Sequence, residues 1–279
     1  MIKIEKCKDE FLKYTERYDV SDEEIKRKQL HSLRVMQRSK IIAQSLKLSE
    51  EEIQVATLIG LLHDIGRFEQ YTRYKTYMDK KSVDHGDLGV EILQENNYIK
   101  KYIEDENWIN VILIAIKNHN KYKIEKGLNK EKELFCKIIR DADKADILYE
   151  RAYIFLEYPK VREQVEKLSI KEEIYEKTLE NKQVNRKNIK NINILDDILI
   201  STCFIFGVNF LKTLEIIKED ESINKTFQKL NLNGQENIRK AEEMKNSINK
   251  YIRENKGWEN GQKAINNRKA ICCNGVCKS

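Results

Sequence analysis

The sequence predicts an all-α fold, and three features of its composition support this prediction. The 279 residues include one proline and only 10 glycines, whereas sheet-rich folds use both residues in their many turns. Lysine, glutamate, isoleucine and leucine are abundant, which favours long helices. Hydrophobic residues make up 40% of the chain and charged residues 35%, a balance typical of globular proteins. We therefore expect a helical bundle with additional helices near the C-terminus.

The first predicted helices begin at capping boxes. Ser21–Glu24 has the capping pattern and is expected to begin a helix that carries His31. Ser49–Glu52 has the same pattern and precedes a strongly apolar helix. That helix leads to the segment 63–66 (His-Asp-Ile-Gly), whose glycine is expected to end it. Residues 67–84 are aromatic, basic and irregular, so we expect a loop there.

Three further helices are expected in the central part of the chain. One begins near His85, and another extends over residues 108–119. A long helix is expected over residues 132–158, where Pro159 stops it.

The C-terminal part is expected to be helical as well, with a charged segment at 160–190, an apolar helix over 192–218 and a helix over 235–254. The sequence thus predicts a helical core over residues 1–158, a helical extension over 159–255 packed on that core, and a flexible basic tail with cysteines over 256–279.

Charge and hydrophobicity limit the partners that we expect. The net charge is +6, but residues 253–279 alone hold six basic and two acidic side chains, so the body has little excess positive charge and no specific nucleic-acid partner is expected. Residues 1–10 are charged throughout, which is unlike a signal peptide. The apolar stretch Ile198–Leu211 is too short to span a bilayer. We therefore expect a cytoplasmic protein without a membrane partner. Its cysteines should be reduced thiols, and the three in the tail (Cys272, Cys273, Cys277) make an incomplete zinc set.

The four histidines indicate a metal site. Each of them falls on or at the end of a predicted helix, and His63 is followed by Asp64 at the end of the most apolar helix. An ionised carboxylate buried there is costly unless a cation compensates its charge. Imidazole and carboxylate ligands together suit zinc, iron, manganese or nickel ions.

This order of residues resembles the HD superfamily of metal-dependent phosphohydrolases, named for a His-Asp pair. The resemblance covers about residues 21–158 and implies a helical bundle of the HD-domain type. It also implies a first metal held by His31, His63, Asp64 and Asp143.

The choice of Asp143 rests on the segment 139–144 (Ile-Arg-Asp-Ala-Asp-Lys), which is similar to the terminal Ala-Asp element of the family. Asp141 is the competitor. The two aspartates are about 200° apart on a helix, so only one can face the metal. Helical periodicity alone leaves both open.

The resemblance extends to members of the superfamily with two metals. By that similarity, Asp64 bridges two ions and the intervening His85 and His119 hold the second one. The expected cofactors are therefore two divalent ions, drawn from manganese, iron, cobalt, nickel, zinc or magnesium.

The activity implied is hydrolysis of a phosphate ester by a metal-activated hydroxide, with a nucleotide or related phosphorylated small molecule as substrate. Asp64 is then catalytic as well as a ligand. Arg67 and Lys144 flank the ligands and are candidate cations for the developing phosphate charge. Aromatic residues in the 67–84 segment, including Tyr71 and Tyr77, could stack on a base.

Two other functions remain open from the sequence. Some two-metal members of the superfamily are di-iron oxygenases with the same ligand order. A non-catalytic sensor that binds a nucleotide in a retained pocket is the other alternative. An oligomer is compatible with both.

Overall fold

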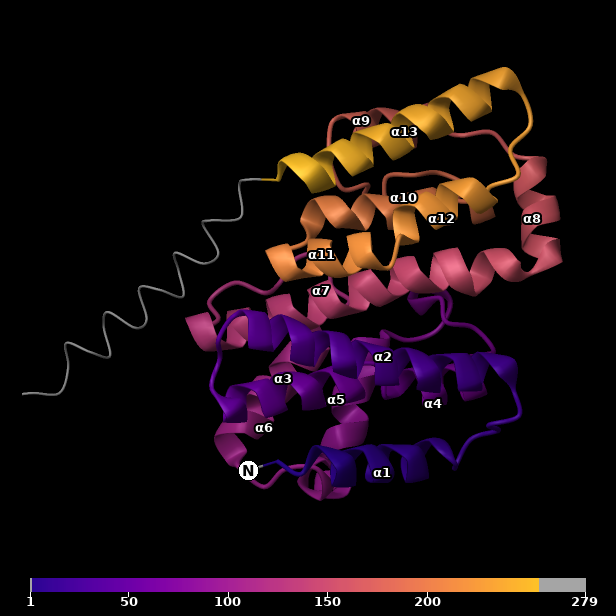
Figure 1. Ribbon diagram of the computed structural model, residues 1–279. Coiled ribbons are helices and arrows are strands. Elements are labelled where there is room, and N and C mark those ends of the chain that lie inside the picture. The colour runs from indigo at the N-terminus through magenta and orange to yellow at the C-terminus, as the bar shows by residue number, and fades with distance from the viewer. Residues whose placement is uncertain (1, 256–279) are drawn as a thin grey trace, which may run out of the picture. The chain divides into compact units, whose positions relative to one another are not determined.

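The computed structural model describes residues 2–255, and these residues form helices, turns and loops without a β-strand in that range (Figure 1). The prediction of an all-α fold is confirmed. The chain divides into two compact units, Met1–Asp146 and Ile147–Ser279, with the boundary inside a helix. The cysteines of the tail lie outside the described residues.

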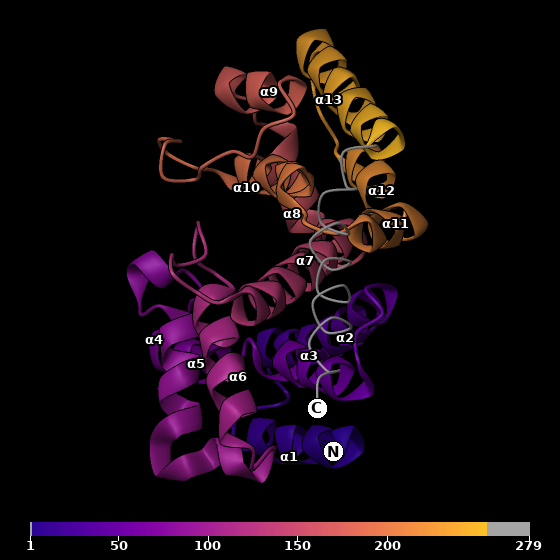
Figure 2. The same cartoon turned by 90° about the vertical axis from the view of Figure 1, so that its left-hand side faces the viewer.

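The first unit carries all four histidines. Its elements are α1 (Ile4–Thr15), α2 (Glu23–Ser45), α3 (Glu50–Leu62), α4 (Gly66–Tyr74), the 3-10 helix η1 (Asp79–Lys81), α5 (His85–Gln94), the 3-10 helix η2 (Glu95–Lys101), α6 (Glu106–Asn118) and the N-terminal part of α7 (Lys130–Tyr153). Helix α2 packs along α3, and α5 packs against both α4 and α6 (Figure 2).

The second unit begins with the end of α7. Its further elements are η3 (Phe155–Glu157), α8 (Pro159–Glu166), α9 (Glu172–Leu179), α10 (Ile194–Thr202), η4 (Cys203–Gly207), α11 (Leu211–Glu219), α12 (Ser222–Lys229) and α13 (Gln235–Glu254). Helix α13 packs against α9 and α12. A capping box begins α10, because Asn193 and Asp196 exchange hydrogen bonds, and Lys171 forms an ion pair with the buried Asp196.

One of the two predicted capping boxes is present. The Ser49 hydroxyl accepts from the Glu52 backbone at 3.3 Å, and the Glu52 carboxylate accepts from the Ser49 backbone at 2.9 Å. The box predicted at Ser21 is wrong. Asp22 caps α2 instead and accepts from the backbone of Glu24, while the Ser21 hydroxyl donates to Asp19.

The loop predicted over residues 67–84 is also wrong in its first half, because residues 66–74 form α4. This helix is only nine residues long, and its buried positions Phe68 and Gln70 do not repeat with a helical period. The predicted helix over 192–218 is divided into α10, η4 and α11. Pro159 occupies the first turn of α8, where its missing N–H costs nothing.

Two glycines allow helices of the first unit to approach closely. A Cβ on Gly60 would lie 2.6 Å from the Ser39 hydroxyl and 2.9 Å from the Met36 Cα, so α2 and α3 are in backbone contact. A Cβ on Gly66 would lie 2.4 Å from the carbonyl oxygen of His85, so the start of α4 touches the start of α5. The first contact joins α2, which carries His31, to α3, and the second joins α4 to α5, which begins with His85.

No helix among the described residues combines the length and the apolar character needed to cross a membrane.

Substitution of Gly66 should separate α4 from α5. The added methyl of Gly66→Ala meets backbone atoms that have no freedom to move aside, so we expect a loss of about 1–3 kcal/mol in the free energy of unfolding. Gly89→Ala is the matched control, because its Cβ would have only ordinary contacts at 3.4 Å or more and alanine favours the helix. Urea unfolding of both variants measures the difference, and equal stability would contradict this account of the contact.

Candidate metal centre

Each histidine of the first unit is placed by the end or the inner face of a helix. His31 lies on α2, and His63 follows the last residue of α3. His85 is the first residue of α5, and His119 follows the last residue of α6. All four are at most 5% exposed, and Asp64 is 2% exposed. The structure therefore gathers every histidine of the chain around one buried carboxylate.

The first group of ligand atoms comes from α2, the end of α3 and α7. The Nε2 atoms of His31 and His63 are 3.3 Å apart. Asp143 Oδ1 lies 3.1 Å from His31 Nε2 and 3.6 Å from His63 Nε2. Asp64 Oδ2 lies 3.5 Å and 3.6 Å from the same two nitrogen atoms. Ligands at 2.0–2.2 Å from one ion are about 3–3.6 Å apart, depending on the angle between them, so these spacings fit one ion.

The second group comes from α5 and α6. The Nε2 atoms of His85 and His119 are 3.0 Å apart, and Asp64 Oδ1 lies 3.4 Å and 3.5 Å from them. The two oxygens of Asp64 thus face different pairs of imidazoles. Asp64 is therefore within reach of both pairs of imidazoles.

The hydrogen bonds of the four Nδ1 atoms indicate which ring nitrogen is available to a metal. Each Nδ1 faces an oxygen that can only accept, so it carries the proton and leaves a lone pair on Nε2. The four acceptors are Asp146 Oδ2 at 2.7 Å from His31, the Gly60 carbonyl at 2.9 Å from His63, Asp79 Oδ2 at 2.8 Å from His85, and the Ile116 carbonyl at 2.6 Å from His119.

The four rings therefore direct lone pairs at one another. Burial lowers the pKa of His63, and burial together with Arg67 lowers the pKa of His85 to about 3, so these imidazoles stay neutral near pH 7. Facing lone pairs repel unless a cation lies between them. The donor set thus fits divalent metal ions of the kind that imidazole and carboxylate prefer.

Two carboxylates, Asp146 and Asp79, each accept a hydrogen bond from the Nδ1 atom of a histidine ring. Asp146 is fully buried and accepts from Arg34 at 2.8 Å and from Arg38 at 3.1 Å as well as from His31. Burial opposes its ionisation, but His31 and Arg34 lower the pKa of Asp146. Asp79 accepts from His85, Arg67 and Gln70, which together outweigh burial and lower its pKa.

Sequence reasoning missed most of these supporting residues. The carboxylate that accepts from His85 is Asp79, six residues earlier, whereas the neighbouring Asp84 and Asp87 have other partners. Asp84 caps α5, and Asp87 pairs with Lys121. Helical spacing in the sequence could have indicated Asp146 and the supporting residues of α2. Asp146 is three residues from Asp143, and the buried face of α2 repeats polar residues every three or four positions (Lys28, His31, Arg34, Arg38).

The other predicted residues lie as follows. Among the described residues, no group of potential metal ligands includes Asp141, although it is fully buried on the same helix as Asp143. The Arg67 guanidinium donates to Asp79 at 3.0 Å and to the Tyr77 carbonyl at 2.6 Å. Burial lowers the pKa of Lys144 to about 8, with Asp141 opposing the shift. The predicted role of Lys144 rests on its place next to Asp143 in the sequence.

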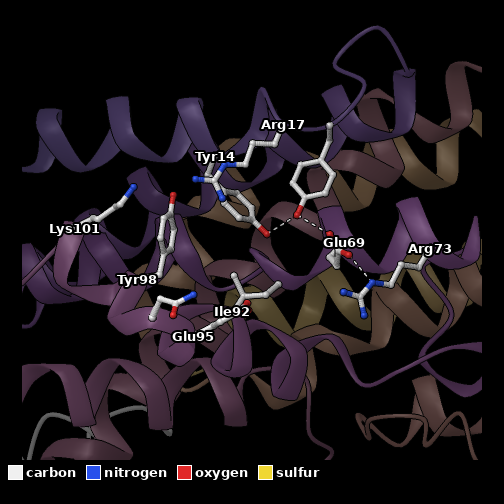
Figure 3. A pocket seen from close by; sticks show the side chains of 10 residues that line it. Tyr14, Arg17, Glu69, Arg73, Ile92, Glu95, Tyr98 and Lys101 are labelled. Atoms are coloured by element: carbon white, nitrogen blue, oxygen red, sulfur yellow. Dashed lines mark hydrogen bonds and ion pairs between the residues drawn. The ribbon is translucent and has the colours of Figure 1, made fainter.

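A cavity of about 600 Å³ lies on the side of α4 that faces α1 and η2 (Figure 3). None of the metal-site residues lines it. Tyr14, Tyr18, Glu69 and Arg73 form a chain of hydrogen bonds along its wall. The Tyr14 hydroxyl also lies 3.4 Å from the carbonyl oxygen of Ile65, the residue after Asp64.

The carboxylate of Asp146 should set the metal affinity. Asp146→Asn keeps the shape but removes the charge that orients His31, so we expect metal affinity to fall about 10–100-fold. Asp87→Asn removes a carboxylate that pairs with Lys121 instead of an imidazole, and should bind metal as the wild type does. Calorimetric titration with Mn²⁺ measures both, and unchanged affinity in the Asp146 variant would refute the role of this residue.

The neutral imidazoles should make the metal-free protein sensitive to acid. The pKa of His85 is lower in the folded chain than its value of about 6.5 in the unfolded chain, so the unfolded chain binds more protons between these values. Stability should be complete above about pH 6.5 and fall with decreasing pH by about 1.4 kcal/mol per pH unit for this group. Urea unfolding with chelator at several pH values tests this, and His85→Gln should show a shallower dependence. Equal slopes would contradict the assignment.

Comparison with known proteins places these residues in a family. Residues 30–148 match the family model of the HD domain. Searches of curated proteins and of solved structures gave no match. HD domains bind divalent metal ions and are associated with metal-dependent hydrolysis in general. The matched segment contains all four histidines, Asp64 and Asp143, which converge as described above. Residues 30–148 of this chain therefore form an HD domain.

Proposed function

We propose that the chain is a metal-dependent phosphohydrolase that cleaves a phosphate ester of a small molecule and uses two metal ions. The observation that carries this proposal is the position of Asp64. Each of its two oxygens faces a pair of imidazole nitrogens at 3.4–3.6 Å, an arrangement that suits two cations on one carboxylate.

The proposed ligands follow from the distances. His31, His63, Asp64 and Asp143 would hold one ion, and Asp64, His85 and His119 the other. Four imidazole nitrogens favour manganese, iron, cobalt, nickel or zinc over magnesium, which prefers oxygen ligands. When bound, such ions supply Lewis acidity that activates water and polarises a phosphoryl oxygen.

The side chains of the protein would supply orientation and charge. Asp64 has its pKa held well below the usual value by Lys28 and Arg67 despite its burial, so it is ionised throughout the physiological range. Asp79 and Asp146 fix the orientation of the His85 and His31 rings, so the ligand nitrogens need no rearrangement. Arg67 lies beside Asp64 and is proposed to face the phosphoryl group, and Lys144 is proposed to assist it.

A nucleotide is the proposed class of substrate. Tyr71 and Tyr77 stack on each other with ring centres 4.8 Å apart, and the Tyr77 ring lies 5.6 Å from the Arg67 guanidinium. Tyr71 is partly exposed, so a base could extend this stack. Phe68, by contrast, is fully buried in the core and is not available to a ligand.

Metal analysis of the purified protein, combined with a screen for phosphatase and phosphodiesterase activity on nucleotides, tests the proposal. We expect close to two equivalents of metal and turnover with added Mn²⁺, Co²⁺, Ni²⁺ or Fe²⁺. His63→Ala and Asp64→Ala should each reduce turnover at least 1,000-fold, because each removes a ligand from the proposed centre. Glu50→Ala, an exposed change at the other end of α3, is the control and should retain activity.

Three results would count against the proposal. Absence of metal under all conditions would remove its basis. Bound iron without turnover of any phosphate ester, together with consumption of oxygen, would favour the oxygenase alternative. Metal and nucleotide binding without turnover would favour the sensor alternative.

A further inference from the structure

Lys28 occupies an unusual position for a lysine. It lies on α2, one turn before His31, and is only 8% exposed. Its Nζ donates to Asp64 Oδ2 at 2.9 Å, the same oxygen that faces His31 and His63. Lysine is rarely buried unless it has a partner of opposite charge. Asp64 is that partner.

Arg67 approaches Asp64 from its other oxygen. Its Nε lies 3.6 Å from Asp64 Oδ1, which is too far for a hydrogen bond. This Nε is buried and has no acceptor among the described residues, although the neighbouring NH1 donates to Gln70, Asp79 and the Tyr77 carbonyl. A buried donor without an acceptor is costly, so this Nε is available to an oxygen atom of a ligand.

Tyr77 connects the two cations. The Lys28 ammonium and the Arg67 guanidinium each lie 5.6 Å from the centre of its ring. The Tyr77 hydroxyl donates to the Glu24 carbonyl at 2.9 Å, which fixes the ring in place. Arg27 lies over the same ring, but it is neutralised by an ion pair with Glu24 at 2.6 Å. Lys28 and Arg67 are therefore two cations at fixed positions beside one carboxylate.

The proposed metal ligation changes the balance of charge around this carboxylate. If Asp64 shares its oxygens with cations, it no longer compensates Lys28 fully, and the buried ammonium needs another anionic partner. Arg67 Nε needs an acceptor for a separate reason. One anion with several oxygen atoms would satisfy both groups.

We infer that Lys28 and Arg67 together bind the terminal phosphoryl group of the substrate, so that the chain acts on phosphomonoesters rather than on diesters. This inference rests on the function proposed above and narrows it. Two fixed cations match the two negative charges of a monoester, whereas a diester carries only one. Lys28 Nζ would donate to one phosphoryl oxygen and Arg67 Nε to another.

Calorimetric binding of two small probes to the Mn²⁺-loaded full chain tests this inference. Methyl phosphate is a dianion near pH 8, and dimethyl phosphate is a monoanion. The wild type should bind methyl phosphate at least tenfold more tightly. Lys28→Met should weaken the binding of methyl phosphate about 10–100-fold, as expected for a lost charge-assisted hydrogen bond, and that of dimethyl phosphate much less. Lys28→Arg, which keeps the charge, should recover most of the affinity.

Matched controls separate binding from folding and from metal loading. Lys26→Met removes an exposed lysine of the same helix and should bind both probes as the wild type does. Metal content is measured for each variant by elemental analysis. Lys28→Met should retain both equivalents of Mn²⁺.

Three alternative outcomes would overturn the inference, and a fourth would overturn only the proposed function. If Lys28→Met binds methyl phosphate like the wild type, Lys28 does not bind the phosphoryl group. If Lys28→Met loses Mn²⁺, Lys28 positions Asp64 and does not bind the phosphoryl group. Equal affinity of the wild type for the two probes, or no binding of either, would remove the preference for monoesters. Selective binding of methyl phosphate without hydrolysis of any monoester would overturn the proposed function and leave the binding inference intact.

Discussion

The first unit is organised around the burial of the Asp64 carboxylate among four imidazoles. Asp64 is almost completely buried and remains ionised, and four imidazole rings direct their lone pairs toward it and toward one another. Both features are unfavourable without positive charge, which Lys28 and Arg67 supply beside Asp64. The same features become favourable once cations occupy the space between the rings. Metal binding and the stability of this unit are thus expected to be closely linked.

The fold serves this arrangement through the ends of its helices. Four of the candidate ligands lie at or next to a helix terminus, namely His63, Asp64, His85 and His119. The helix ends meet at the site, so their side chains reach it directly. The close contact at Gly66 brings two of these termini together. Gly66 therefore helps to position the candidate metal ligands, although it supplies no ligand atom itself.

Sequence reasoning reached the fold class because composition and helical patterning act over long segments. It also singled out the histidines, since only four are present and they fall in a recognisable order. It failed where one residue decides a local structure, as at Asp22, which caps α2 in place of Ser21, and in α4, which is only nine residues long. The partners of the imidazoles depend on contacts between residues far apart in sequence, such as His31 with Asp146. No local pattern encodes those pairings. The repeat of polar residues on one face of α2 is the only local sign that this face has polar partners.

The centre has two halves, one with His31 and His63 and the other with His85 and His119. The Nδ1 atoms of the two halves have the same kinds of hydrogen-bond acceptor. In each half, one ring is supported by a carboxylate (Asp146 or Asp79) and the other by a backbone carbonyl. The donor strength of the rings is therefore similar on both sides, and Asp143 is the main difference between them. Under the proposed ligand assignment, the half that contains Asp143 would fill at a lower concentration of free metal than the other half. The chain would then pass through a singly loaded form, and the supply of metal ion in the cell would decide how much of it is fully assembled.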